Sequence, residues 1–397
     1  MNHPGAAHSD SHDGAHSDPE LVPYVGVIAI MTGPMPAHDE LAAALDQRLG
    51  RSVDLLAAEL AAPGDDDALF AFVTQAIRPC PKPGPQWRCW AVAALSDDRW
   101  AVLLAARHDI ADAGTVTDVL AGLSTDGAVP GPVGAPHPST RAPGRPTSFS
   151  AVQVALADAE SVCRTFDVTL NELALTAVTN GLRSALRHRG RDPRRISVHT
   201  RQPLSARAVA AAARMSRRIP VLRRALPVEE PDVLRQLQNV HRTVADFKAD
   251  ARHRSPWSVP SPALLPVELA RRAFTMVTAP PRDDLLVAMT NVTGPRRPGD
   301  MLGRPIVAMV GVPPVPPPGQ VAVMLLTYGP DLFFGLTADC DTFPEADDVT
   351  HGMARTVEHL AAAARHPHPG RPALALIGPR ATGDHLLGER NTDDRAG

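Results

Sequence analysis

The chain has 397 residues, of which 44% are hydrophobic, enough to form either two domains or one large domain with two similar parts. With 40 basic and 43 acidic side chains, the composition excludes the strongly basic surface that is typical of nucleic-acid-binding proteins. No apolar run approaches the roughly 20 residues that span a membrane, no secretory segment is recognisable, and the four cysteines contain no C-x-x-C pair, so we expect reduced thiols in a cytoplasmic protein.

Three segments lack the pattern of a folded domain. Residues 1–20 are rich in His, Ser, Asp and Gly without periodicity, and residues 379–397 are polar, so we predict a disordered tail at each end. Residues 128–148 contain six prolines and are predicted to form an extended linker. This linker divides the chain into an N-terminal half, residues 21–127, and a C-terminal half, residues 149–378.

Strands alternate with helices in the predicted N-terminal half. The apolar runs that are short and bounded by turn residues indicate strands, and those with helical periodicity indicate helices. The closely spaced prolines at 79–85 end the second helix. The predicted strands are 24–31, 87–95 and 100–106, and the predicted helices are 39–49 and 68–77.

The C-terminal half is predicted to hold five helices and five strands. One helix has a clear start signal, because Thr169 and Glu172 form the T-x-x-E pattern of a capping box before a periodic apolar run. A Gly-Pro-Asp turn joins the last two strands into a hairpin. The predicted helices are 151–166, 169–187, 231–247, 265–277 and 347–364, and the predicted strands are 196–200, 285–293, 304–310, 320–328 and 332–339.

The most informative stretch begins where the strand at 100–106 ends. His108 follows closely, and Asp112 comes four residues later, just before a helix-like run to Leu123. A histidine in this position can face a cleft and take a proton from a bound nucleophile. The H-x-x-x-D spacing is a weak signal by itself, because His108 also fits an ordinary surface position and Asp112 fits the N-cap of the following helix.

Several ordered motifs together resemble the bacterial wax ester synthase/diacylglycerol acyltransferase family, which belongs to the CoA-dependent acyltransferases alongside the condensation domains. The similarity covers most of residues 22–366 and rests on the order and spacing of the motifs. The matching runs are the strand and helix at 24–49, PQW at 85–87 (family P-L-W), RHDIADA at 107–113 (H-H-x-x-x-D-G), TLNE at 169–172 (T-V-N-D), PLSAR at 203–207 (P-V-S-V-R) and TNVTGP at 290–295 (S-N-V-P-G-P).

The resemblance implies an α/β fold of two similarly built mixed α/β halves, like that of chloramphenicol acetyltransferase, with the active site in a tunnel between them. It implies transfer of an acyl group from acyl-CoA to a hydroxyl acceptor, such as diacylglycerol or a long-chain alcohol, which gives a triacylglycerol or a wax ester. It implies no metal and no cofactor beyond acyl-CoA as co-substrate. Peripheral contact with a membrane or a lipid droplet is left open.

The resemblance also assigns roles within the H-H-x-x-x-D-G run. His108 is the general base that deprotonates the acceptor hydroxyl. Asp112 is structural: it turns away from the substrate and pairs with an arginine, for which Arg207 is the matching candidate. The N-cap interpretation of Asp112 is compatible with this role, and Arg207 also fits a solvated surface position.

Further candidates surround these residues. Asn291 either donates its amide to the developing oxyanion or is a turn residue before Thr-Gly-Pro, and Asn171 helps to position its helix near the site. Arg107 replaces the first histidine of the motif. It either lowers the pKa of His108 by like-charge repulsion, points to the opposite side of the strand or marks a decayed site. Gly114 stands one position after the place of the motif glycine.

The departures from the family pattern keep two other functions open. The stretch at 50–84 is much shorter than in relatives, where it helps to shape the substrate channel. One alternative is an acyltransferase or condensation enzyme of specialised metabolism that uses a carrier-protein thioester. Such a donor predicts a basic patch at one tunnel mouth. The other alternative is a catalytically decayed relative that binds lipid or a partner.

Overall fold

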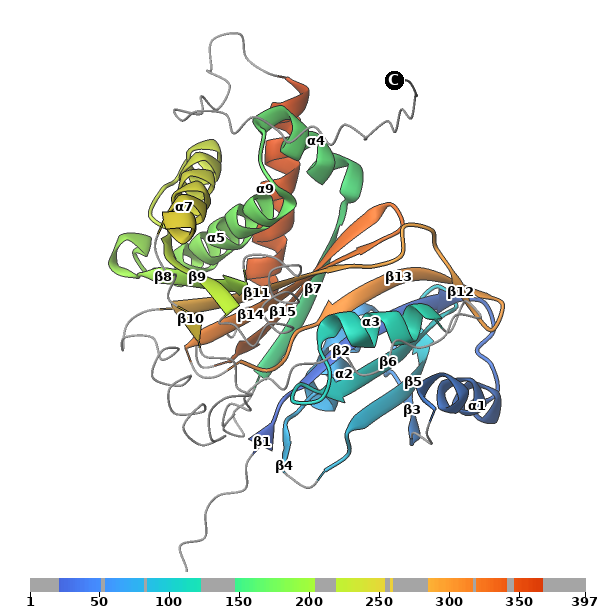
Figure 1. The fold of residues 1–397 in the computed structure, drawn as a ribbon. Helices are drawn as coiled ribbons and strands as arrows, with labels where there is room; N and C mark the ends of the chain where they lie inside the picture. The colour runs from blue at the N-terminus through green and yellow to red at the C-terminus, as the bar shows by residue number, and fades with distance from the viewer. Residues whose placement is uncertain are drawn as a thin grey trace, which may run out of the picture.

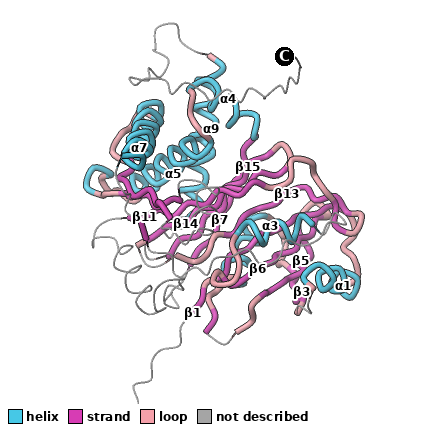
Figure 2. The backbone as a smooth tube through the Cα atoms, in the orientation of Figure 1, coloured by secondary structure: helices cyan, strands magenta, loops and turns pink. Residues whose placement is uncertain are grey.

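The structure is a computed structural model that describes residues 21–50, 54–81, 84–122, 147–203, 219–253, 258–259, 285–316, 319–340 and 346–366. Two large sheets lie against one another, each with helices packed beside it (Figure 1). Helices α5, α7 and α9 gather on one side of the strands, and α1 and α3 lie on the other side (Figure 2). The arrangement is a mixed α/β fold with two sheet-based halves, as predicted.

The first sheet has six strands in the order β12-β13-β2-β6-β5-β3, accompanied by three helices. A separate two-stranded ribbon pairs β1 with β4 beside it. The bounds are β1 Leu21–Val22, β2 Tyr24–Thr32, α1 His38–Leu49, β3 Leu55–Glu59, α2 Asp66–Ala76, β4 Cys80–Pro81, β5 Trp87–Leu95, β6 Arg99–Arg107, α3 Ala113–Ala121, β12 Asp300–Met301 and β13 Arg304–Val312.

The second sheet has seven strands in the order β10-β9-β8-β11-β14-β15-β7. β8, β11 and β14 run parallel to one another, and β14, β15 and β7 form antiparallel pairs. The bounds are β7 Thr147–Ala155, α4 Leu156–Phe166, α5 Leu170–His188, the short 3-10 helix η2 Pro193–Arg195, β8 Val198–Pro203, β9 Ile219–Leu226, α7 Val233–His253, β10 Ser258–Val259, β11 Leu285–Thr293, β14 Gln320–Tyr328, β15 Asp331–Asp339 and α9 Ala346–Arg365.

The packing of the core explains why the sequence of β14 is a continuous apolar run. Side chains alternate between the two faces of a strand, and both faces of β14 are covered. Met324 and Leu326 pack into the cluster built around the first sheet, whereas Val323 and Leu325 pack into the cluster formed with α5 and α9. A strand covered on both faces needs apolar residues at every position.

β13 joins the two parts of the chain. It follows β11 of the second sheet, pairs with β2 in the first sheet, and leads back to β14 in the second. Near the end of β13, Gly311 meets Gly335 of β15 so closely that an added Cβ on Gly335 would overlap the Gly311 carbonyl. The two sheets therefore divide the chain differently from the linker: β12 and β13 come from the predicted C-terminal half, 149–378, but complete the N-terminal sheet.

Most predicted elements are confirmed, with one clear error. Residues 151–155, predicted as the start of a helix, are the second half of β7, which pairs with β15 along its whole length, and the helix begins at Leu156. The sheet partner decides the conformation of this alanine-rich stretch. The predicted tails at 1–20 and 379–397, the linker except for its last two residues, and the predicted helix at 265–277 lie outside the described residues.

Candidate active site

His108 lies in a tight turn directly after β6. Its backbone N–H donates to the carbonyl of Pro23, at 2.9 Å, which ties the turn to the chain just before β2. The N–H groups of Ile110 and Ala111 both point back to the carbonyl of Arg107, at 3.0 and 3.2 Å. The side chain is half-buried, and its Nδ1 atom is shielded from solvent. The histidine is therefore held at a fixed place between β6 and α3.

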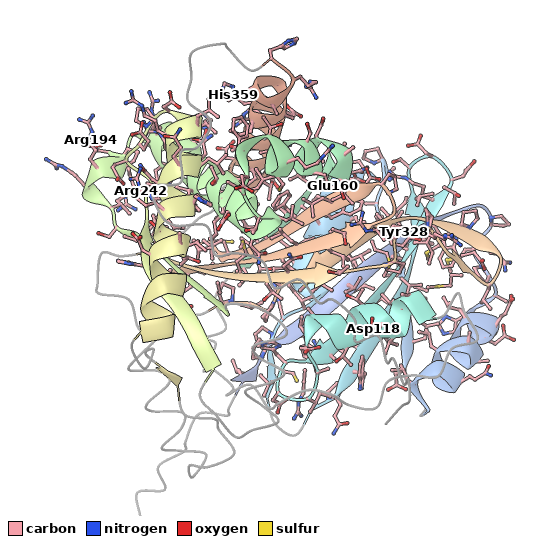
Figure 3. All side chains as sticks on the ribbon, turned by 45° about the horizontal axis from the view of Figure 1, so that its top comes forward. Asp118, Glu160, Arg194, Arg242, Tyr328 and His359 are labelled. Carbon is pink, nitrogen blue, oxygen red and sulfur yellow. The ribbon has the colours of Figure 1, made fainter. Side chains whose placement is uncertain are left out.

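Asp112 begins α3 as its N-cap. Its Oδ1 accepts from the backbone N–H and from the hydroxyl of Thr115, both at 2.8 Å. Figure 3 shows Asp118 farther along α3, on its exposed side. The N-cap interpretation of Asp112 is confirmed. Arg207 lies outside the described residues, so its pairing with Asp112 stays a prediction.

Arg107 is held by the second residue after it. Its Nε and Nη2 donate to the two carboxylate oxygens of Asp109, at 2.9 and 2.8 Å, in a bidentate pair. The pKa of Arg107 is raised, chiefly by this hydrogen bond. Because Asp109 balances the charge of Arg107, the geometry gives no support to the expected like-charge effect on His108. Arg107 stands at the place of the first motif histidine, and its role in the site stays a prediction.

The two candidate asparagines meet. The side-chain amide of Asn291, near the end of β11, donates to the side-chain oxygen of Asn171, in the first turn of α5, at 3.0 Å. The contact is open to solvent. β11 also contacts α3, the helix that Asp112 caps. The structure thus brings together Asn171 of α5 and Asn291 of β11, and β11 lies next to the helix that follows His108.

The turn after Asn291 is fixed to the neighbouring strand β14. The N–H of Gly294 donates to the carbonyl of Thr327, at 3.1 Å, and the N–H of Gly329 donates to the carbonyl of Pro295, at 2.9 Å. Tyr328, labelled in Figure 3, accepts from the N–H of Gly299 at 2.9 Å. The Thr-Gly-Pro turn is therefore anchored at several points.

Comparison with known proteins fits this arrangement. Residues 218–361 match the family model described as the WS/DGAT C-terminal domain. Over this range the chain is similar to WS/DGAT proteins. A Mycobacterium tuberculosis protein named probable diacylglycerol O-acyltransferase is 27% identical over 438 residues, which cover 89% of this chain and 95% of that protein.

Solved structures agree on the fold. A wax ester synthase/diacylglycerol acyltransferase from Marinobacter aquaeolei VT8 aligns with a TM-score of 0.61 at 18% identity, over 87% of this chain and 96% of that one. The first condensation domain of the CDA synthetase aligns with a TM-score of 0.54 at 15% identity, over 88% of this chain and 93% of that one. The expected α/β fold of the WS/DGAT proteins is confirmed; the tunnel between the halves stays a prediction.

The WS/DGAT model covers only one side of the candidate site. Its matched range begins at residue 218 and includes Asn291, but it does not reach His108 or Asn171. Gly114 lies in the first turn of α3, where an added Cβ would make only ordinary contact, at 3.5 Å, with Asp112. The helix therefore does not require glycine there, and the site-shaping role of Gly114 stays a prediction.

No sequence motif marks His241, which contacts the capping box of α5. Its Nδ1 lies 3.2 Å from Oε2 of the buried Glu172, which also accepts from the N–H of Thr169 at 2.8 Å. The capping box of α5 is confirmed. His241 lies 69 positions farther along the chain, on α7, and no local pattern links it to Glu172. The pair joins α5 to α7.

Two features of the described residues bear on cofactors and membranes. Across the ranges given above, no three His, Cys, Asp or Glu side chains are grouped as a metal site would require. None of the helices in those same ranges is both long and apolar enough to cross a bilayer. The expectation of acyl-CoA as the only co-substrate, without metal or cofactor, stays a prediction.

Proposed function

We propose that the chain is an O-acyltransferase that moves an acyl group from acyl-CoA to the hydroxyl of diacylglycerol or a long-chain alcohol, with His108 as the general base. The observation that carries the proposal is the fixed turn at the end of β6, which holds His108 half-buried next to the N-terminus of α3. The names of the WS/DGAT relatives support the reaction class.

The chemistry needs one base and no covalent enzyme intermediate. The imidazole takes the proton of the acceptor hydroxyl, and the oxygen attacks the thioester carbonyl. The tetrahedral intermediate then expels CoA as a thiolate, which takes the proton back from His108, so that an ester and free CoA leave. Because Nδ1 of His108 is shielded from solvent, we assign the proton transfer to Nε2. A positioned base contributes about 10²- to 10⁴-fold to the rate.

Asn291 is the candidate for stabilising negative charge on the thioester oxygen. A primary amide has two N–H donors, and Asn171 accepts from the amide of Asn291 at 3.0 Å. This contact orients the amide and leaves the second N–H for a developing oxyanion. Because the acceptors are lipids, we also propose that the chain works in the cytoplasm in peripheral contact with a lipid surface.

The test is CoA release from palmitoyl-CoA, measured with a thiol reagent, with and without hexadecanol or a diacylglycerol. We expect acceptor-dependent release and a matching ester product by mass spectrometry, and a loss of about 10²- to 10⁴-fold in His108→Ala. His188→Ala is the matched control, since His188 lies on the surface beside Asp348. Equal rates in wild type and His108→Ala would refute His108 as the base.

A result without any CoA release has a defined meaning. If wild type is inactive with every acceptor but transfers an acyl group from a carrier-protein thioester, the donor in the proposal is wrong and the carrier-bound alternative is correct. If wild type binds the acyl chain but transfers it from neither donor, the chain is a lipid-binding relative. The palmitoyl-carrier thioester is therefore run in parallel.

A further inference from the structure

An ion pair brackets the candidate base. Arg107 and Asp109 stand on either side of His108 in the sequence, and they meet through two parallel hydrogen bonds of 2.9 and 2.8 Å. Their side chains are only 12% and 13% exposed. Bidentate pairs between arginine and carboxylate are the geometrically most specific ion pairs in proteins, and burial keeps water from competing with them. This pair closes a small ring around the backbone of His108.

The same arginine ties the turn to a second segment. The backbone N–H of Arg107 donates to the carbonyl of Gln86 at 2.9 Å, and its Nη1 reaches the carbonyl of Gly84 at a longer 3.4 Å. Tyr24, the cross-strand partner of Arg107, donates its hydroxyl to the carbonyl of Pro85. Three successive carbonyls of the 84–86 segment are thus held by two neighbouring side chains and one backbone N–H.

The side chain of Tyr24, which holds this segment, is also buried. The ring of Tyr24 is fully buried, and the guanidinium of Arg88 lies over it at 4.2 Å from the ring centre. The hydroxyl of Tyr24 also lies 3.0 Å from the thiol of Cys80. The 84–86 segment, the start of β2 and the turn after β6 therefore form one packed unit, with the ion pair of Arg107 at the side of His108.

We propose that Arg107 and Asp109 are positioning residues for His108, whose ion pair fixes the turn at 107–111 against the 84–86 segment and so sets the place of the imidazole. The inference rests on the proposed function of His108 as the base. It assigns a role to Asp109, which no motif marks, and it explains how the chain keeps an ordered site with arginine in place of the first motif histidine.

The proposal predicts a loss in turnover more than in substrate affinity. A catalytic group that moves by about 1 Å can lose about 10²-fold in rate, whereas neither Arg107 nor Asp109 is assigned a contact with acyl-CoA. Removing one partner alone would leave a buried charge without its counterpart. The test variant therefore removes both charges at nearly constant size, as Arg107→Gln with Asp109→Asn.

We expect the double variant to fold, with kcat lowered about 10- to 100-fold and KM for palmitoyl-CoA within about 2-fold of wild type. Arg107→Lys keeps the charge but not the bidentate geometry, so it should retain more of kcat than Arg107→Gln. Arg107→His restores the family residue but cannot span both oxygens of Asp109, so it should behave like Arg107→Gln. If the double variant fails to fold, Arg107→Lys decides, because it keeps the charge opposite Asp109 and loses only the bidentate geometry. An unchanged kcat in Arg107→Lys would then overturn the proposal.

A second readout does not depend on activity. Carbethoxylation of His108, followed by peptide mass spectrometry, should be faster in the double variant, because loss of the pair lets the imidazole turn and exposes Nδ1, which is shielded from solvent in the wild type. The matched control is Arg99→Gln with Asp66→Asn, which removes the ion pair at the opposite end of β6 and should change neither readout. Wild-type kcat or wild-type carbethoxylation in the folded double variant would overturn the proposal.

The two proposals fail in different ways. If His108→Ala keeps full activity, the base is not His108, yet the carbethoxylation rate still shows whether the ion pair fixes its position. If His108→Ala is inactive while the double variant keeps wild-type kcat and labelling, the base is correct and the positioning role is wrong.

Discussion

The turn that carries His108 and the contact that carries Asn291 are built in different ways. His108 is fixed through its own backbone by Pro23, through its neighbour Arg107 by Asp109, and through the capped start of α3. Asn291 has an anchored turn after it, but its side chain is oriented by one solvent-exposed hydrogen bond to Asn171.

Because of this difference, the two sides should respond differently to substitution. A buried, bidentate pair resists motion, whereas a single exposed hydrogen bond contributes only about 1 kcal/mol or less to stability. A base must keep a fixed distance to the proton that it takes from the acceptor hydroxyl. An oxyanion donor acts on the charge that develops on the carbonyl oxygen. We therefore expect substitutions around His108 to disturb the structure of its turn and to lower kcat. Substitutions of Asn171 and Asn291 should lower kcat without disturbing the fold.

After His108→Ala, the largest expected effect is on the asparagine side. Asn291→Ala should lower kcat by about 10²- to 10³-fold, the usual loss for an oxyanion donor, with little change in melting temperature. Asn171→Ala removes only the orienting contact, so its loss of kcat should be much smaller. Steady-state kinetics of CoA release measure both. If Asn291→Ala keeps wild-type turnover, Asn291 is only the turn residue of the alternative interpretation.

The next largest effect concerns the contact between β13 of the first sheet and β15 of the second. Gly335→Ala would press a Cβ onto the carbonyl of Gly311, so β13 and β15 must move apart. We expect a loss of about 1–3 kcal/mol in the free energy of unfolding, the usual cost of overpacking. Denaturant titration measures it. Gly114→Ala is the matched control, since its Cβ makes only ordinary contact, and an equal loss there would contradict this explanation.

The smallest effect concerns the cap of α3. Asp112→Ala should cost about 1 kcal/mol of unfolding free energy, because it removes the acceptor of the Thr115 N–H. Asp112→Asn keeps an equally good cap, so its stability should stay close to wild type. A loss of about 3–5 kcal/mol in Asp112→Asn would instead reveal a buried charge partner, for which Arg207 is the candidate.

Much of the fold could be predicted from local pattern. Residues 285–293 begin with a short apolar run and end at turn residues, and the strand has those bounds. Thr169 and Glu172 announce the start of α5, because capping depends only on neighbours. The error at 151–155 has the opposite origin. That stretch acquires its conformation from β15, which lies far along the chain, and no local propensity reports such a partner.

The candidate site shows the same limit. The capping role of Asp112 is local and was predictable. The pair of Arg107 and Asp109 forms in the turn after β6, where strand alternation no longer decides which side chains meet, so the sequence left three interpretations of Arg107 open. The contact of Glu172 with His241 joins two distant helices, and the sequence holds no sign of it. The roles of His108 and Asn291 stay predictions.

The path of β13 has a consequence for how the protein is made. The first sheet gains β13 beside β2 only when residues 304–312 have been synthesised. Until then the growing chain presents the edge of β2 with unpaired backbone groups, which attract other strands. The N-terminal part therefore cannot complete its folding on the ribosome ahead of the rest, and a fragment that ends in the linker should aggregate unless the remainder is co-expressed to supply the missing strand.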